Sequence, residues 1–133
     1  HWAAHKLESL TRYRLRHGEA VSIGMGIDTL YSVYAGFLPA AQGERILRTL
    51  ETIGLPIWAE AVLARAPHGR LALLAGLREF QEHLGGGLHV TMLHDIGAGF
   101  EVNEIDEGLV LRAIEALEAR AARNEMPRRA TGF

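Results

Sequence analysis

The segment from residue 18 to residue 35 most constrains the fold, because it is apolar on almost every side. Its apolar residues are Ala20, Val21, Ile23, Met25, Ile27, Leu30, Tyr31 and Val33. A helix that is apolar all round is stable only when other elements surround it. Gly24 and Gly26 each cost about 1 kcal/mol in a helix interior, so we expect another backbone or a ligand to approach closely there. The sequence therefore predicts a fold built around this helix.

Further helices are predicted on both sides of this segment, together with one small β-hairpin. Apolar spacing indicates helices over residues 1–11, between Pro39 and Gly54, and over 57–65, 70–84 and 107–122. Asp106 is the predicted N-cap of the last helix. Alternation over residues 88–93 indicates a strand, and residues 100–102 could pair back with it. We predict a mainly α fold, with a helical metal-binding domain over residues 1–123 and a flexible tail over 124–133.

Composition excludes several classes of protein. The 133 residues include no cysteine, so a disulfide scaffold is excluded and any metal must be held by His, Asp or Glu. The formal net charge of −2 gives no electrostatic reason to expect nucleic acid or an anionic membrane as a partner. No apolar run reaches the roughly 18 residues of a membrane span. We expect a cytoplasmic protein.

Three histidines in the first 17 residues are the main candidates for chemistry. Imidazole is the commonest metal ligand among side chains. His1 and His5 are four residues apart, which places them with Glu8 on one face of the predicted helix. His1 could instead share a metal with His17 across two helices, and spacing does not choose between these pairs. Spacing is equally compatible with histidines that only form hydrogen bonds.

Two motifs resemble the C-terminal half of dehydroquinate synthase and of its sugar-phosphate cyclase relatives. Residues 1–8 (HWAAHKLE) are similar, from the first histidine onward, to the family motif GHxxxHxxE. Residues 17–25 (HGEAVSIGM) match the family motif HGEAVxIGM almost completely. Residues 86–97 resemble the family's strand that ends in an Ile-Gly turn. The resemblance covers about residues 1–118.

The resemblance implies an enzyme whose site lies between two domains. Such enzymes have an N-terminal domain that holds NAD and a C-terminal helical domain that holds zinc or cobalt through one Glu and two His. By motif position, His1 and His17 would be the histidine ligands, and the glutamate would lie upstream of this chain. His5 would be a catalytic residue that faces the substrate near its phosphate. Glu8 and Glu19 would support the ligands from outside.

The implied activity is that of a carbon–oxygen lyase acting on a small sugar phosphate. NAD transiently oxidises a substrate hydroxyl, phosphate leaves, and an intramolecular aldol reaction closes a carbocycle. The metal acts as a Lewis acid. The resemblance also implies a homodimer for the whole enzyme. We expect the isolated chain to be inactive, because it lacks the NAD domain and the third ligand, and to expose apolar surface on residues 18–35.

One departure from the family pattern bears on the substrate. Dehydroquinate synthases usually carry an Asp-Lys-Lys run before the strand, and one lysine meets acidic groups of the substrate. The aligned residues here are Phe80, Gln81 and Glu82. Gln81 and Glu82 would meet a substrate carboxylate poorly. We therefore expect them to face a substrate that lacks the carboxylate or differs nearby.

Two other functions compete with this one. Metal-dependent alcohol dehydrogenases also combine HxxxH with a distant His-Gly, but they usually continue HGxxNAxxLP, whereas residues 17–21 read HGEAV. The other alternative is a non-catalytic helical interaction module with structural histidines. The motif at residues 17–25 favours the cyclase.

Overall fold

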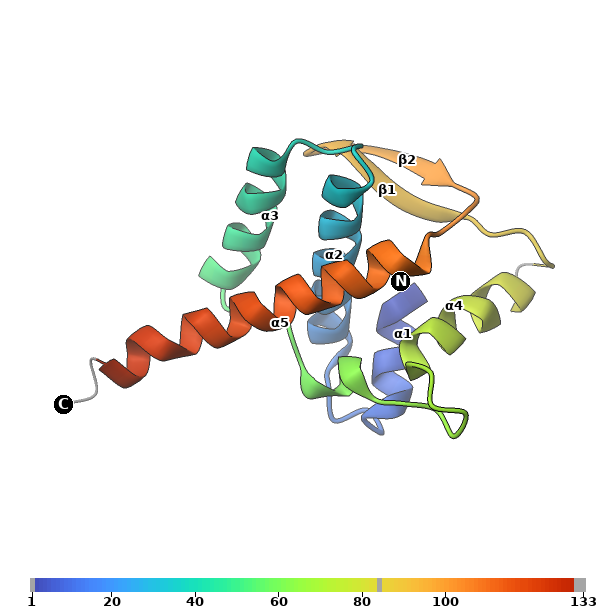
Figure 1. Cartoon of the computed structure of the whole chain (residues 1–133), viewed down its shortest axis with the longest axis horizontal. Coiled ribbons are helices and arrows are strands. Elements are labelled where there is room, and N and C mark those ends of the chain that lie inside the picture. Colours follow the sequence, from blue (N-terminus) through green and yellow to red (C-terminus); the bar gives the residue numbers. More distant parts are fainter. Residues whose placement is uncertain (1, 84, 131–133) are drawn as a thin grey trace.

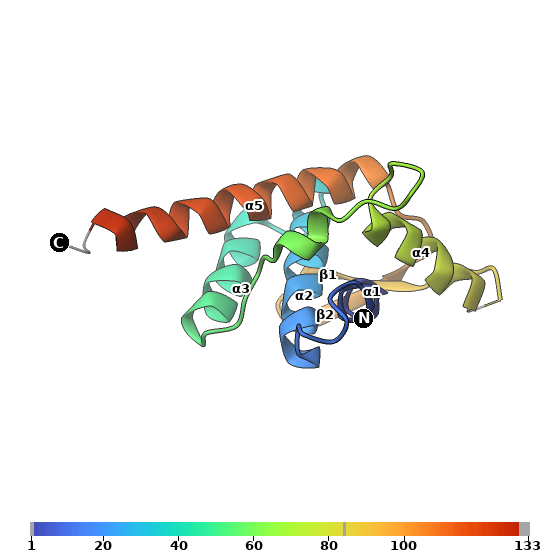
Figure 2. The same ribbon diagram turned by 90° about the horizontal axis from the view of Figure 1, so that it is seen from below.

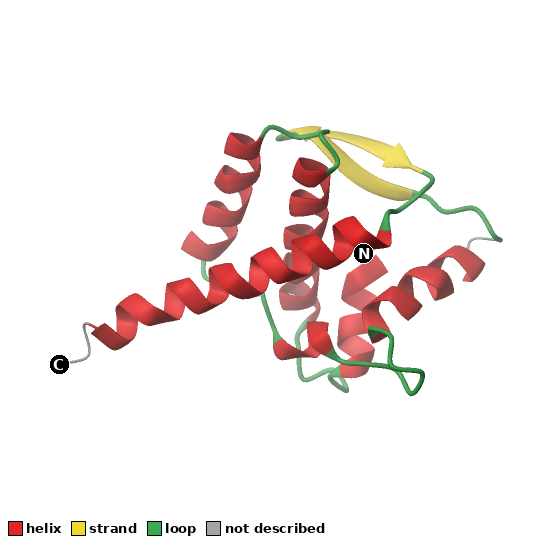
Figure 3. Ribbon diagram, in the orientation of Figure 1, coloured by secondary structure: helices red, strands yellow, loops and turns green. Residues whose placement is uncertain are grey.

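In a computed structural model, residues 2–83 and 85–130 are described, and they form a helical domain with one β-hairpin (Figure 1). The elements are α1 (Trp2–Leu10), α2 (His17–Tyr34), α3 (Ala40–Thr52), the short 3-10 helix η1 (Glu60–Leu63), α4 (Ala72–His83), β1 (Val90–Asp95), β2 (Ala98–Val102) and α5 (Glu107–Ala130). The strands pair antiparallel. The predicted mainly α fold with one small hairpin is confirmed (Figure 3).

Helix α2 is the central element of the fold. It packs against α1, α3, α5 and β1. A Cβ atom on Gly24 would lie 3.6 Å from the Cβ of Ala3, and one on Gly26 would lie 3.4 Å from a methyl group of Leu117. Both glycines therefore face a neighbouring helix at short range. The predicted approach of another backbone is confirmed at Gly24, where the Ala4 nitrogen would lie 3.7 Å from the added Cβ, and is wrong at Gly26, where the neighbours are the Leu117 and Leu47 side chains.

Helix α5 closes the helical layer on one side. In Figure 2 it runs along one side of the molecule, with α1, α2, α3 and α4 on the other. Arg120 joins it to α3 through ion pairs of 2.6 Å to Glu44 and 2.7 Å to Glu51. Two carboxylates on one guanidinium hold the Arg120 pKa above its ordinary value, chiefly through the hydrogen bonds that the guanidinium donates to Glu44 and Glu51.

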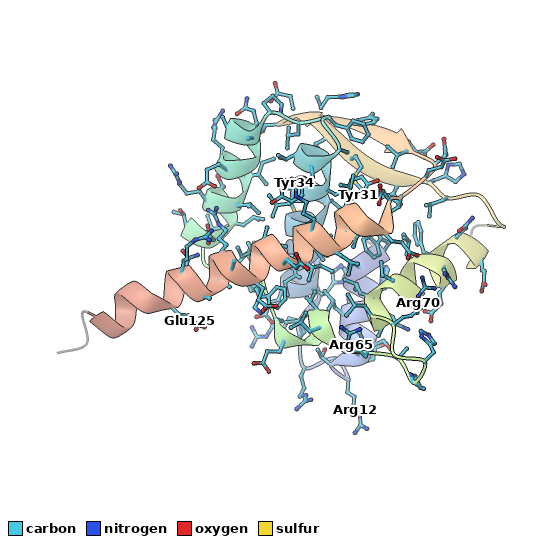
Figure 4. All side chains as sticks on the ribbon, in the orientation of Figure 1. Arg12, Tyr31, Tyr34, Arg65, Arg70 and Glu125 are labelled. Atoms are coloured by element: carbon cyan, nitrogen blue, oxygen red, sulfur yellow. The ribbon has the colours of Figure 1, made fainter. Side chains whose placement is uncertain are left out.

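Two tyrosines of α2 hold the beginning of α5 (Figure 4). The backbone N–H of Asp106 donates to the Tyr31 hydroxyl at 2.9 Å. The Arg112 guanidinium lies 4.0 Å from the centre of the Tyr34 ring, a cation–π contact. The Asp106 carboxylate accepts from the N–H of Gly108 at 2.8 Å, which confirms it as the N-cap.

The predicted end of the last helix at residue 122 is wrong, because α5 continues to Ala130. Residues 118–126 are rich in Ala, Arg, Glu and Met, which have high helix propensity. The Asn124 side chain also donates to Glu51 of α3. The flexible tail over 124–133 stays a prediction, and residues 131–133 lie outside the described part. Across the described ranges, no helix is long and apolar enough to cross a membrane.

A half-buried carboxylate lies where α1 crosses α2. Trp2 is 3% exposed, and its indole N–H donates to Asp28 at 3.1 Å. Burial raises the pKa of Asp28 to about 6, and the hydrogen bond from Trp2 only partly offsets that rise. A raised acid pKa favours the folded state while the group is protonated, so this contribution is complete below the unfolded pKa and is lost as pH rises through 6.

We expect Asp28→Asn to stabilise the protein above pH 6 and to have little effect at pH 4. The amide still accepts from Trp2 but carries no buried charge. The rise of about two pKa units sets an upper limit of about 3 kcal/mol. Thermal unfolding from pH 4 to pH 8 measures the effect, with the exposed Glu104→Gln as the control. A stability difference that is the same at both ends of this range would contradict the assignment.

Candidate metal centre

The connector between α1 and α2 places His17 beside Glu8. The N–H of Tyr13 donates to the carbonyl of Glu8 at 2.8 Å, which closes the end of α1. Arg12 and Tyr13 have φ angles of 52° and 61°, so the chain turns through the left-handed region. The Arg12 side chain points away from the body of the molecule (Figure 4). The chain reverses here, and α2 begins at His17.

Glu8 and His17 form a close carboxylate–imidazole pair. His17 Nδ1 lies 2.6 Å from Glu8 Oε1. The Glu8 side chain is 14% exposed and the His17 side chain 60%. A carboxylate only accepts, so this bond places a proton on Nδ1, and in the neutral imidazole the lone pair is then on Nε2. Histidines that bind metals are held by an outer carboxylate in this way.

His5 shares this part of the surface with His17. The centres of the two imidazole rings are 6.2 Å apart. His1, the other predicted ligand, lies outside the described residues, so the choice between His5 and His17 as its partner stays a prediction. Within residues 2–83 and 85–130, no group of three or more His, Asp or Glu is arranged to hold a metal. The described donors, an imidazole with a supporting carboxylate, nevertheless fit the chemistry of zinc.

Glu19 acts on the first turn of α2. Its Oε1 accepts from the backbone N–H of Arg16 at 3.0 Å, which is the reach-back bond of a capping box. The described contact is thus to the helix terminus, at the residue next to His17. Glu19 fixes the backbone that carries the imidazole, whereas Glu8 contacts the imidazole itself.

Gln81 and Glu82 lie at the end of α4. The side-chain amide of Gln81 donates to the carbonyl of Gly86 at 2.9 Å. The backbone carbonyl of Gln81 accepts from the N–H of Gly86 at 3.0 Å. Gly86 has a φ of 95°, which glycine adopts readily. Glu82 lines a pocket of about 210 Å³ with His68 and Arg78. Neither residue lines the pocket next to His5, and their contact with substrate stays a prediction.

A pocket of about 230 Å³ lies between α1 and α4, next to the His5–His17 surface. It is lined by Trp2, His5, Lys6, Ser9, Gly76, Glu79 and Phe80. Sequence reasoning missed Lys6, Gly76 and Glu79. The signal that could have found them was Gly76, a glycine inside an otherwise regular amphipathic helix.

The 3-dehydroquinate synthase C-terminal family model matches residues 1–73. This chain belongs to that family. A 3-dehydroquinate synthase of Chlorobium chlorochromatii is 36% identical over 118 residues, which cover 87% of this chain and 32% of that protein. One from Rhodopseudomonas palustris is 28% identical over 126 residues, covering 91% and 33%. The chain thus spans about a third of the length of these relatives.

A solved structure shares the fold of this family member. It is ValA, the 2-epi-5-epi-valiolone synthase of Streptomyces hygroscopicus, with NAD+ and Zn2+ bound. The similarity has a TM-score of 0.76 at 24% identity and covers 89% of this chain and 32% of that chain. At this identity, the match establishes the common fold.

Proposed function

We propose that this chain is the metal-binding domain of an NAD-dependent sugar-phosphate cyclase. The observation that carries the proposal is the Glu8–His17 pair, in which a carboxylate oxygen lies 2.6 Å from Nδ1 of the imidazole. Family membership over residues 1–73 supports the reaction class. The reaction eliminates phosphate from a sugar phosphate and closes the ring by an aldol step.

The residues of this chain bind and orient in this proposal. His17 binds the divalent metal, zinc or cobalt, through Nε2, together with His1 and a glutamate from elsewhere in the enzyme. When bound, NAD supplies a transient oxidation and the metal supplies Lewis acidity. Glu8 holds the ring of His17, and Glu19 holds the turn that carries it. His5 faces the substrate phosphate from the edge of the α1–α4 pocket.

The end of α4 favours a substrate without a carboxylate. Phe80 contributes an apolar wall, and Gln81 uses its amide on the glycine turn. Glu82 adds a negative charge at the end of α4, outside the pocket next to His5, and would repel a carboxylate that reached it. We therefore propose that the substrate is a sugar phosphate without a carboxylate. The alternative is the heptulosonate phosphate, which carries a carboxylate and from which 3-dehydroquinate forms.

The proposed enzyme includes more than this domain. The relatives are about three times as long, so we propose that a nucleotide-binding domain completes the site. We further propose that the complete enzyme is a cytoplasmic homodimer. The chain alone should turn over no substrate.

The test is phosphate release by this domain combined with its nucleotide-binding domain, with NAD and zinc present. We expect kcat/KM for a neutral heptulose phosphate to exceed that for the acidic heptulosonate phosphate by about tenfold or more, the scale of one charged contact. Gln81→Lys should narrow that difference. Preference for the acidic substrate would overturn the substrate class. No phosphate release from either, with no change on His17→Ala, would overturn the enzyme.

A further inference from the structure

Lys6 is held in the α1–α4 pocket by a glycine. A Cβ atom on Gly76 would lie 2.8 Å from Cγ and 2.9 Å from Cβ of Lys6, so only glycine leaves room for this side chain to cross α4. The Lys6 side chain is 20% exposed, and its ammonium lies 2.9 Å from Glu79. A lysine fixed in this way has already lost most of its rotamer freedom. The structure therefore presents a positioned cation.

Among the residues that line this pocket, Lys6 is the side chain that carries a permanent positive charge. Its seven lining residues, all within the described ranges, include no arginine and no other lysine. Ser9 adds a hydroxyl and His5 an imidazole on the same helix. Glu79 is the one lining carboxylate, and its side chain is 62% exposed. Glu79 can therefore turn to solvent at small cost, because an exposed ion pair of this kind contributes only about 0–1 kcal/mol.

The size and position of the pocket suit a phosphate group. A volume of about 230 Å³ exceeds what a phosphate occupies and leaves room for adjoining carbon atoms of a sugar. His5, on its wall, is 6.2 Å from His17, so a ligand seated here lies next to the proposed metal centre. Lysine is a common phosphate binder, acting as a point charge.

We propose that Lys6 binds the substrate phosphate in the α1–α4 pocket, and that Glu79 holds the ammonium in place until phosphate displaces it. This inference rests on the proposed function. The phosphate-binding cation is then on α1, at the residue that follows His5. Gly76 is the positioning residue, because it sets where the Lys6 stem lies.

The experiment titrates inorganic phosphate into the 133-residue chain and follows backbone amides by NMR. Lys6→Met keeps the stem against Gly76 and removes the charge, so we expect phosphate affinity to fall about tenfold or more. Lys6→Arg should retain most of the affinity. Glu79→Gln removes the competing carboxylate and should raise affinity severalfold. Gly76→Ala displaces the stem without changing charge and should also weaken binding.

Arg78→Met is the matched control, because it removes one cation from α4 that lines the pocket with His68 and Glu82 and does not line the α1–α4 pocket. It should leave phosphate binding unchanged. An equal loss in Arg78→Met and Lys6→Met would show non-specific attraction and overturn the proposal. Wild-type affinity in a folded Lys6→Met variant, or no saturable binding by the unaltered chain, would also overturn it.

Zinc binding separates this inference from the proposed function. Lys6→Met should bind zinc as the unaltered chain does. Retained zinc binding with no Lys6 effect on phosphate overturns the Lys6 assignment alone. In the opposite case, Lys6→Met lowers phosphate affinity, but His17→Ala does not change zinc affinity. That result supports the phosphate pocket and overturns the metal-dependent function.

Discussion

Leu117→Ala is expected to lower the free energy of unfolding by about 2–5 kcal/mol, the range for a buried leucine truncated to alanine. The Leu117 side chain is fully buried, and its methyl groups would lie 3.4 Å and 3.5 Å from a Cβ on Gly26. Gly26 has no side chain that could move into the space left behind. The cavity would therefore stay open between α5 and α2, where these two helices pack together.

Leu111→Ala is the matched control on the same helix. Leu111 is 40% exposed, so its truncation removes less buried area and leaves no closed cavity; we expect a loss below about 1 kcal/mol. Urea denaturation followed by circular dichroism measures both variants. Similar losses for the two leucines would show that α5 does not depend on its contact with Gly26.

The elements of this fold were predictable because their signals are local. Apolar periodicity identified α2 and the helices around it, and Asp106 was recognisable as an N-cap from its position before an apolar run. The two glycines of α2 indicated close packing, because glycine destabilises a helix interior and its presence there suggests a tightly packed neighbour. The length of α5 was missed because the tail's polar composition was weighted above its helix propensity.

The contacts that shape the candidate site were beyond sequence reasoning because they join distant segments. Lys6 and Glu79 are 73 positions apart, and their meeting depends on which faces of α1 and α4 pack together. Trp2 and Asp28 meet for the same reason. Gln81 shows a different limit. Its motif position suggests a substrate contact, but its side chain satisfies a backbone carbonyl in the glycine turn.

Zinc affinity is expected to fall about 10–100-fold on Glu8→Gln, the range for removing an outer partner of a metal-bound histidine. The amide still accepts from His17 Nδ1, so the variant isolates the loss of negative charge. Glu8→Ala removes the acceptor as well and should cost more. His17→Ala removes the proposed ligand and should reduce affinity most. Competition with a chromogenic chelator measures all three relative to the unaltered protein.

Glu19→Gln distinguishes a supported imidazole from a merely well-formed helix start. Both glutamates make a contact at the start of α2, but Glu19 contacts the Arg16 N–H and Glu8 contacts the His17 ring. Glu19→Gln should therefore lower thermal stability slightly and leave the zinc affinity of the folded protein nearly unchanged. If Glu19→Gln and Glu8→Gln weakened zinc binding equally, the geometry of the helix start would be sufficient to explain the site. The Glu8 carboxylate, 2.6 Å from His17, would then have no separate role in holding the metal.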